Sequence, residues 1–357
     1  MKQLLYINFS PDVYRVKEEL YKQQSHVFLY KQQLARYCDV HYILRSNFDF
    51  EEVHTGVRVC SVKGGVLNFL VVIRRYVRKN KIEVCIVHGL DYFLNASAIK
   101  LVTGCRVILQ HHAEKTYLRK KAILMRFCDK LISAYFFNGK GLARPFVEGN
   151  FISGEKIFEV TEGTSHFEFL ERPASQGPKK IVFVGRLNGN KNVFTILKAL
   201  VLVASYTRDF VLCIYYTNND QEKELKKFCD DNNLNELVFF KGALPNQDIQ
   251  KVLSESDIFV SASLYEGSGY SLIEAMACGC YIIASRIPAH IFLLGGMEEK
   301  ALFDPLNEQE LAHHIKALVL KTMVPETFRS VRAHFQKRAS AEAIANQITR
   351  VIESLPQ

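Results

Sequence analysis

The sequence predicts an α/β protein built from two doubly wound, mainly parallel sheets. Short apolar runs of strand length alternate with segments of helical spacing along most of the chain. A stretch containing two prolines and a glycine, Leu170–Pro178, interrupts this alternation near the middle. The 357 residues are enough for two domains of ordinary size.

The composition is that of an ordinary soluble protein, with 48% apolar and 23% charged residues. The first apolar run, Leu4–Phe9, is too short for a signal-peptide core and is followed by no cleavage site. No apolar run reaches the roughly 18–20 residues that are needed to span a bilayer. We therefore expect a cytoplasmic protein.

The nine cysteines are scattered, and several lie inside apolar, strand-like runs. This pattern is typical of buried thiols in a reducing compartment and not of a disulfide framework. Cys278 and Cys280 have no second pair at metal-ligand spacing, so we expect no zinc site.

The net charge of +9 is confined to the first half of the chain. Residues 1–175 contain 26 Lys and Arg against 17 Asp and Glu, which leaves 20 of each sign for the remainder. A one-sided basic surface indicates an anionic partner, which is membrane lipid, nucleic acid or an acidic substrate.

The first half contains alternating strands and helices of one doubly wound sheet. Strands are expected over Leu4–Phe9, Val40–Leu44, Val57–Val62, Glu83–His88, Arg106–His112, Leu131–Phe137 and Lys156–Thr161. Helices are expected over His26–Tyr37, Gly64–Lys79, Tyr92–Val102 and Gly141–Val147, the last broken by Pro145.

Three histidines fall at the ends of predicted strands. His88 ends one strand, and His111 and His112 end the next. Because ligands of parallel sheets bind beyond the carboxyl ends of the strands, these positions favour a role in binding.

The segment Lys115–Lys130 has the pattern of a basic amphipathic helix. Leu118, Ala122 and Met125 form an apolar stripe beside several lysines and arginines. Such a helix either lies in a membrane interface or is a surface helix that buries its apolar face. Both interpretations stay open.

The second half repeats the alternation after the predicted linker. Strands are expected over Lys180–Val184, Phe210–Tyr216, Val238–Lys241, Ile258–Ser263 and Cys280–Ser285, with helices over Asn192–Ala204, Gln221–Asn232 and Asn246–Glu255. The predicted domains are 1–170 and 180–324, joined by a linker at 171–179. Residues 325–357 have helical composition and are expected to cross back to the first domain.

The loop after the strand Ile258–Ser263 is the most informative stretch. Gly267 and Gly269 allow backbone N–H groups to approach a ligand. Ser271 and Glu274 have the spacing of a capping box, which predicts a helix starting at about that point. A glycine-containing loop at a helix N-terminus favours phosphate, and the carboxylates of Glu266 and Glu274 suit a polyhydroxylated group. The alternative is that Glu274 only caps its helix and Glu266 is solvated.

A second loop, Gly185–Lys191, joins a strand to a helix and contains Arg186 and Lys191. Its glycine spacing is not that of a P-loop, and Asn192 stands where Ser or Thr would bind Mg²⁺. Two cations beside a glycine loop suit a diphosphate. They are equally compatible with two solvated side chains in a turn.

Together these stretches resemble the large retaining glycosyltransferase family four, whose members have the GT-B fold. The family carries two glutamates separated by seven residues with a glycine between them, matched by Glu266, Gly269 and Glu274-Ala-Met-Ala-Cys-Gly279. It also carries Gly-Arg-Leu followed by Lys, matched by Gly185-Arg186-Leu187 and Lys191. Val160–Phe167 is similar to a family segment before the hinge. The resemblance is strong over 180–306 and loose over 1–170.

The resemblance implies two doubly wound, Rossmann-like domains that face each other across a cleft. It implies that the second domain binds a nucleotide sugar, with UDP or GDP as the expected nucleotide. Arg186 and Lys191 would bind the diphosphate, Glu274 the ribose, and Glu266 the transferred sugar. The donor-binding set is completed by Gly185, Gly267, Ser268, Gly269, Tyr270 and Ser271. His112 would face the sugar from the first domain, and neither a metal nor another cofactor would be required.

The acceptor side departs from the family, because the loop after the first strand lacks glycine. The candidate acceptor-binding residues are Ser10, Ser25 and His26 near that loop, and His88 and His111 at the ends of later strands. The expected acceptor is a glycan or glycolipid of surface polysaccharide or lipopolysaccharide type, made by hexose transfer at the inner face of the cell membrane.

Three other functions stay open. One is a nucleotide-sugar epimerase of the same fold, and another is a protein that binds sugar nucleotides without turnover. A nucleic-acid-binding function would use the basic half, but the chain carries no recognised nucleic-acid module, so no nucleic acid is expected as a partner.

Overall fold

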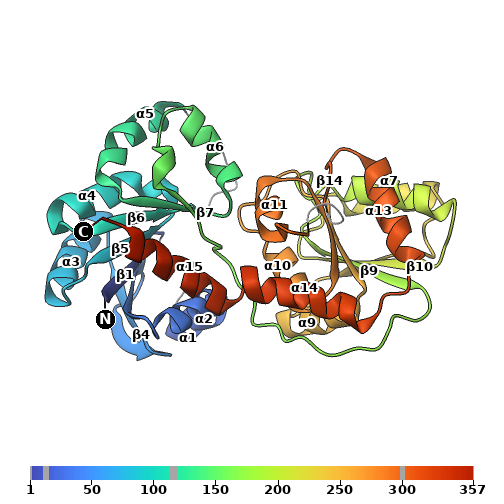
Figure 1. The fold of residues 1–357 in the computed structure, drawn as a ribbon, viewed down its shortest axis with the longest axis horizontal. Coiled ribbons are helices and arrows are strands. Elements are labelled where there is room, and N and C mark those ends of the chain that lie inside the picture. Colours follow the sequence, from blue (N-terminus) through green and yellow to red (C-terminus); the bar gives the residue numbers. More distant parts are fainter. Residues whose placement is uncertain (1, 11–15, 112–118, 298–301, 357) are drawn as a thin grey trace. The chain divides into compact units, whose positions relative to one another are not determined.

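The computed structural model describes residues 2–10, 16–111, 119–297 and 302–356. Within these residues the chain divides into two compact units (Figure 1). The first unit comprises Met1–Thr164 and Ser340–Gln357, and the second comprises Ser165–Ala339.

The described strands of the first unit form one sheet in the order β3-β4-β2-β1-β5-β6-β7-β8. Neighbouring strands are parallel except for β3 and β4. The strands are β1 (Lys2–Asn8), β2 (Cys38–Ser46), β3 (Phe50–His54), β4 (Val57–Lys63), β5 (Val84–His88), β6 (Arg106–Gln110), β7 (Ala134–Phe137) and β8 (Ile157–Glu159).

The antiparallel edge strand β3 lies outside the strands predicted from sequence. It forms a hairpin with β4, in which His54 pairs with Val57 across a two-residue loop. Both loop residues, Thr55 and Gly56, have positive φ, at 48° and 83°. This is the backbone that a two-residue hairpin favours, so the glycine was the available signal.

The helices of the first unit include α1, which was not predicted, and α6, which was predicted over Gly141–Val147 but with a break at Pro145. The helices are α1 (Lys17–Gln23), α2 (Ser25–Leu34), α3 (Val66–Lys79), α4 (Phe93–Thr103), α5 (Arg119–Cys128), α6 (Lys140–Glu148) and α15 (Ala341–Ser354). The predicted break at Pro145 is wrong, because α6 continues through it. Leu142 and Phe146 on either side of the proline are buried, and this packing offsets the loss of one backbone hydrogen bond.

The C-terminal helix α15 belongs to the first unit. Ile344, Ile348 and Ile352 of α15 share one core with Leu4 and Tyr6 of β1, and α15 packs against α2 (Figure 1). Lys2 Nζ donates to the carbonyl of Ile352 at 3.4 Å. The two ends of the described chain are therefore joined within the same unit.

The described strands of the second unit form a parallel sheet in the order β11-β10-β9-β12-β13-β14. The strands are β9 (Lys179–Gly185), β10 (Phe210–Tyr216), β11 (Val238–Gly242), β12 (Ile258–Ser261), β13 (Tyr281–Ser285) and β14 (Leu302–Phe303). The helices are α7 (Val193–Ala204), α8 (Glu222–Asp231), α9 (Asn246–Glu255), α10 (Tyr270–Ala277), α11 (Pro288–Leu294), α13 (Glu308–Val319) and α14 (Pro325–Arg338). Of these, α11, α13 and β14 were not predicted as separate elements.

Both faces of the second sheet are covered, which explains its apolar strand sequences. Ile258 and Val260 of β12 point into a core shared with α7 and α13. The alternate residue Phe259 points into a second core, shared with α9, α10 and α14. A strand that is buried on both sides needs a continuous apolar run instead of alternating polarity.

The segment predicted as a linker contains no helix or strand before Lys179, where β9 begins, and it is held against the second unit. Arg172 Nη1 donates to the carbonyl of Ser254 at 3.0 Å and to that of Ser256 at 2.5 Å. Its guanidinium also stacks 3.5 Å from the centre of the Phe328 ring. These contacts fix the chain before β9 begins.

In the described part of the chain, no helix combines the length and apolar composition that crossing a bilayer requires.

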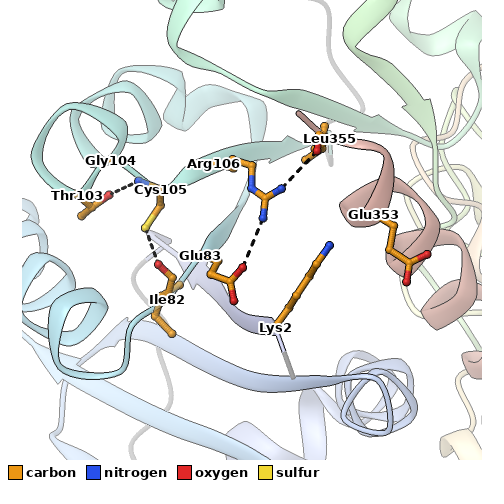
Figure 2. A pocket seen from close by; sticks show the side chains of 9 residues that line it. All are labelled: Lys2, Ile82, Glu83, Thr103, Gly104, Cys105, Arg106, Glu353 and Leu355. Carbon is orange, nitrogen blue, oxygen red and sulfur yellow. Dashed lines mark hydrogen bonds and ion pairs between the residues drawn. The ribbon is translucent and has the colours of Figure 1, made fainter. Parts of the chain in front are cut away.

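A cavity of about 650 Å³ opens in the first unit at the amino ends of β1, β5 and β6 (Figure 2). Arg106 spans it, with Nη1 3.4 Å from the carbonyl of Leu355 and Nη2 3.7 Å from Glu83 (Figure 2). These bonds hold the end of α15. The cavity lies at the edge opposite to the carboxyl ends of the strands, where ligands of such sheets bind.

Candidate active site at the switch point of the second sheet

The chain reverses its direction across the second sheet between β9 and β12. From β9 the strands proceed through β10 to β11 on one side, and from β12 through β13 to β14 on the other. Loops at the carboxyl ends of two such strands diverge and leave a crevice, which is the usual ligand site of this architecture. Here those loops are 186–192 after β9 and 262–269 after β12.

The two loops are joined by backbone and side-chain hydrogen bonds. The amide of Leu264 donates to the carbonyl of Asn190 at 2.8 Å. Asn190 Nδ2 donates in turn to the carbonyl of Tyr265 at 3.0 Å. This pairing brings the following residue of each loop, Lys191 and Glu266, together.

Lys191 and Glu266 form a buried ion pair at the crevice. Lys191 Nζ donates to Glu266 Oε1, and the two side chains are only 12% and 7% exposed. Ser263 Oγ donates to the same carboxylate oxygen at 2.7 Å. Burial opposes ionisation of Glu266, but the charge of Lys191 and these two hydrogen bonds outweigh it and lower the pKa of the carboxyl.

Gly269 ends the loop that carries Glu266 and begins α10. Its φ of 67° lies in the left-handed region, so a side chain there would strain the backbone. The predicted capping box is wrong, because no side chain caps this helix. With Gly269 as the N-cap residue, Ser271 is already the second residue of α10 and stands too late to cap it.

Glu274 lies half-buried in the second turn of α10, and burial raises the pKa of its carboxyl to about 7. None of the described residues donates a hydrogen bond to this carboxylate. Glu266 and Glu274 therefore differ. Glu266 is a carboxylate paired with Lys191, whereas Glu274 has a carboxyl with a pKa of about 7. Neither side chain is simply solvated. For Glu266 this contradicts the alternative that the sequence left open.

The remaining donor-site candidates occupy the same two loops. Gly185 is the last residue of β9, and a Cβ there would lie 3.0 Å from the Phe183 ring and 3.8 Å from the Lys191 side chain. Arg186 is exposed at the start of its loop. The other candidates stand at the junction with α10 and are Gly267, Ser268, Tyr270 and Ser271.

Asn192, which stands where a P-loop would have Ser or Thr, has a structural role. It adopts a left-handed φ of 51° immediately before α7. Its Nδ2 donates to the carbonyl of Pro305 at 2.8 Å, and its Oδ1 accepts from Thr195 Oγ1 at 3.0 Å. These bonds fix the loop end that presents Lys191.

His290 is a residue of this site that the sequence patterns did not single out. It lies in α11, directly after β13, and is 1% exposed. Burial, only partly offset by the nearby Glu266 charge, lowers the pKa of its ring to about 4. The available signal was its position after a strand end, the criterion that selected His88 and His111.

The first unit presents its candidates at the carboxyl ends of β5 and β6. His88 Nδ1 lies 3.9 Å from Oε1 of the buried Glu162. The amide of Glu162 donates to Asn138 Oδ1 at 2.7 Å. His111 is buried, with its ring stacked 4.7 Å from that of Phe137. Glu162 is a second residue that sequence reasoning missed, although it lies in the segment that is similar to the family.

The other acceptor candidates do not join this group in the described part of the chain. Ser10 is exposed, and its amide donates to Asn8 Oδ1 at 3.0 Å. Ser25 is exposed at the first position of α2, and the backbone of His26 follows it in the same helix. His112 lies outside the described residues.

In comparisons with known proteins, the chain is similar to glycosyltransferases. The glycosyl transferases group 1 family matches residues 167–340. An uncharacterized glycosyltransferase of Methanocaldococcus jannaschii is 28% identical over 246 residues, which are 66% of this chain and 58% of that protein. The serotype-specific mannosyltransferase WbdA of Escherichia coli is 24% identical over 204 residues, which are 56% of this chain and 24% of that protein.

Among solved structures, Anabaena HepE in complex with UDP and glucose is similar over 98% of this chain and 100% of its own, with a TM-score of 0.68 and 14% identity. The fold is therefore of GT-B type, as the sequence predicted. The match of residues 167–340 to the glycosyl transferases group 1 family confirms the predicted family. It spans little more than half of the archaeal relative and about a quarter of the E. coli mannosyltransferase.

Removing one member of the Lys191–Glu266 pair should destabilise the second unit. Lys191→Met leaves a buried carboxylate without its counter-charge, and we expect a loss of about 3 kcal/mol in the free energy of unfolding. The double variant Lys191→Met/Glu266→Gln should recover most of this loss. Urea denaturation at pH 7 measures both, with exposed Lys198→Met in α7 as the control. Equal losses in the single and double variants would contradict the pairing.

The raised pKa of Glu274 should make stability depend on pH. Its pKa in the folded protein is about 7, above the ordinary value of 4.5, so the folded state holds more protons between these pH values. Stability should therefore fall as pH rises from about 4.5 to 7. Because Gln does not ionise, Glu274→Gln should avoid this fall, which is on the order of 2 kcal/mol in the free energy of unfolding.

Urea denaturation at pH 5 and pH 8 measures this effect, with the exposed Glu255→Gln of α9 as the control. The stability advantage of Glu274→Gln over the parent protein should be larger at pH 8. Parallel pH profiles for the two proteins would rule out a buried, ionising Glu274.

Proposed function

We propose that this protein is a retaining glycosyltransferase that moves a hexose from a nucleotide sugar to a glycan or glycolipid acceptor. The observation that carries the proposal is the buried Lys191–Glu266 pair at the switch point of the second sheet. The family supplies the reaction class, and the mannosyltransferase relative and the UDP- and glucose-bound structure support a hexose on a UDP or GDP carrier.

The second unit takes the donor in this proposal. An ammonium group has three N–H donors, so Lys191 keeps its bond to Glu266 and still donates to a diphosphate oxygen. Glu266 has a second carboxylate oxygen for a hydroxyl of the transferred sugar. Arg186 adds a second cation, and the N-terminus of α10, with Gly269, Tyr270 and Ser271, adds backbone N–H groups.

Glu274 binds the ribose in this proposal, because its carboxyl has spare capacity for hydrogen bonds. A carboxyl with a pKa near 7 gains from two hydroxyl donors, since hydrogen bonds to the charged form favour ionisation. Donor binding and deprotonation of Glu274 are then coupled.

Catalysis consists mainly of stabilising the leaving diphosphate. Lys191, Arg186 and the α10 N-terminus place positive charge where negative charge develops when the sugar–phosphate bond breaks. The departing phosphate takes the proton of the acceptor hydroxyl on the same face of the sugar, so no side chain of this chain acts as nucleophile.

The first unit takes the acceptor in this proposal. His88 is the last residue of β5 and His111 follows β6, at the sheet edge where a ligand of that unit binds. His112, outside the described residues, stays the candidate that faces the transferred sugar. The buried Glu162 orients His88, and Ser10, Ser25 and His26 remain candidates for contacts to a larger acceptor.

Sugar transfer should depend on the ion pair. We expect Lys191→Met and Glu266→Gln to lower kcat/KM by about 100-fold or more, because each removes a charge that acts on the transition state. The assay is release of nucleoside diphosphate from UDP-glucose, UDP-galactose and GDP-mannose with lipid and glycan acceptors. Lys198→Met in α7 is the matched control.

Transfer at the parent rate in both variants would overturn the proposed site. Conversion of the donor sugar without an acceptor would indicate an epimerase instead. Binding of these donors with no turnover, by calorimetry, would indicate a binding protein.

The partner of the basic first unit is an anionic membrane surface in this proposal, at the inner face of the cell membrane. Helices α3, α4 and α5 pack side by side along one side of the unit (Figure 1). Their sequences contain no Asp or Glu, and their basic residues are Arg74, Arg75, Arg78, Lys79, Lys100, Arg119, Lys120, Lys121 and Arg126. We call this layer the basic face.

Large apolar side chains of these three helices are exposed. Leu67 of α3, Leu101 of α4 and Phe127 of α5 are 81%, 71% and 70% exposed. Apolar side chains near cations suit a lipid interface, where the apolar groups enter the bilayer and the cations meet anionic headgroups. Two of these three side chains are leucines, which cannot stack on bases as aromatic side chains do, and this favours lipid over nucleic acid. The face includes the described part of Lys115–Lys130 and extends it to α3 and α4.

Membrane binding should require both anionic lipid and the basic face. The parent protein should float with phosphatidylglycerol-containing vesicles in low salt and be released by high salt. Arg74→Gln/Arg75→Gln/Arg78→Gln should lower the partition coefficient by about 100-fold, at about 1 kcal/mol for each cation. Vesicle flotation measures this.

The control triple variant Lys223→Gln/Lys241→Gln/Lys251→Gln, in exposed positions of the second unit, should bind like the parent protein. Equal binding to neutral vesicles at any salt concentration, or to RNA and not to vesicles, would overturn this part of the proposal.

A further inference from the structure

His290 lies beside the candidate donor site, and its position indicates a role in ligand binding. It is the third residue of α11, which follows β13, and β13 pairs directly with β12. The loop after β12 carries Glu266, and the ring of His290 interacts electrostatically with both Glu266 and Lys191. The histidine is almost completely buried.

The hydrogen bonds of the ring define its tautomer. His290 Nδ1 lies 2.9 Å from the backbone carbonyl of Ser285, which can only accept a hydrogen bond. Nδ1 therefore carries the proton. Because burial lowers the pKa of the ring to about 4, the ring is neutral at pH 7 and Nε2 carries a lone pair.

The unprotonated edge of the ring faces the start of α10. A Cβ placed on Gly269 would lie 3.7 Å from His290 Cδ2 and 3.9 Å from Nε2. Gly269 directly follows the loop residues Glu266–Ser268. None of the described residues donates a hydrogen bond to His290 Nε2, so this buried acceptor is aimed at the site without a partner in the described chain.

The chemistry of Nε2 restricts what a bound ligand presents to it. A lone pair accepts a hydrogen bond, so the group opposite must be a donor. Phosphate oxygens are acceptors at neutral pH and are excluded. A sugar hydroxyl is a donor, and Glu266, the proposed contact of the transferred sugar, lies in the adjoining loop.

We propose that His290 binds the sugar of the donor, accepting a hydrogen bond at Nε2 from one of its hydroxyl groups and so contributing to the choice of sugar. The inference rests on the proposed function, because it assigns a role within the same donor site. It adds a determinant of sugar specificity that lies on α11, outside the two loops that carry the charges.

Two substitutions separate the two nitrogens of the ring. The amide of Asn in His290→Asn retains a donor for the Ser285 carbonyl but no acceptor at the position of Nε2. The longer Gln in His290→Gln brings an acceptor oxygen to that position. Exposed His313→Asn in α13 is the control for a histidine change elsewhere in the unit.

Calorimetry should compare UDP with UDP-glucose and GDP with GDP-mannose on the full-length protein. For the pair that the parent protein binds, we expect His290→Asn to weaken binding of the sugar nucleotide by about tenfold, the effect of one lost hydrogen bond. The affinity of His290→Asn for the nucleotide without sugar, UDP or GDP, should stay within about twofold of that of the parent protein. His290→Gln should retain most of the sugar-nucleotide affinity.

Equal weakening of nucleotide and sugar nucleotide in His290→Asn would overturn the proposal, because it would indicate a structural role or a contact to the nucleotide. Unchanged affinity, or a sugar that adds nothing to binding in the parent protein, would also overturn it. Failure of the parent protein to bind any of the four ligands would instead refute the proposed donor site, and the role of His290 with it.

Discussion

The ion pair between Lys191 and Glu266 is the constraint around which the second unit is arranged. A buried lysine and a buried carboxylate are tolerated only together, so the loops that carry them must meet. The bonds of Asn190 to the facing loop and of Asn192 to Pro305 hold these loops in register. An apolar pair would satisfy the fold as well, which is why we attribute the pair to ligand binding.

The pKa values of two carboxyl groups in the same site are shifted in opposite directions. Glu266 has a lysine and a serine as partners and ionises readily, whereas burial raises the pKa of Glu274 to about 7. Glu266 and Glu274 are close in sequence, yet one lies in a loop and the other in α10, so their neighbours differ. His290, neutral through burial, adds a hydrogen-bond acceptor next to Gly269. Such different neighbouring polar groups suit a ligand with a diphosphate and several hydroxyls.

Charge divides the two units. The second half of the chain is balanced in sign, and the excess of basic residues lies in the first half, much of it on α3, α4 and α5. Positive charge at the candidate site of the second unit is local and internal, as in Lys191. Positive charge in the first unit is spread over several helices, and this distribution is the basis for the proposed membrane partner.

The sequence by itself determined the fold class, the family and most strands, because continuous apolar runs such as Ile258–Ser261 are readable without tertiary contacts. It also selected Lys191, Glu266 and Glu274, whose spacing from glycines is local. It failed where partners distant in sequence decide: the non-capping Ser271, the unbroken α6, and the buried His290 and Glu162. The pKa of a carboxyl likewise depends on burial and on neighbours from other loops, so only the tertiary structure showed that the pKa of Glu266 is lowered and that of Glu274 is raised.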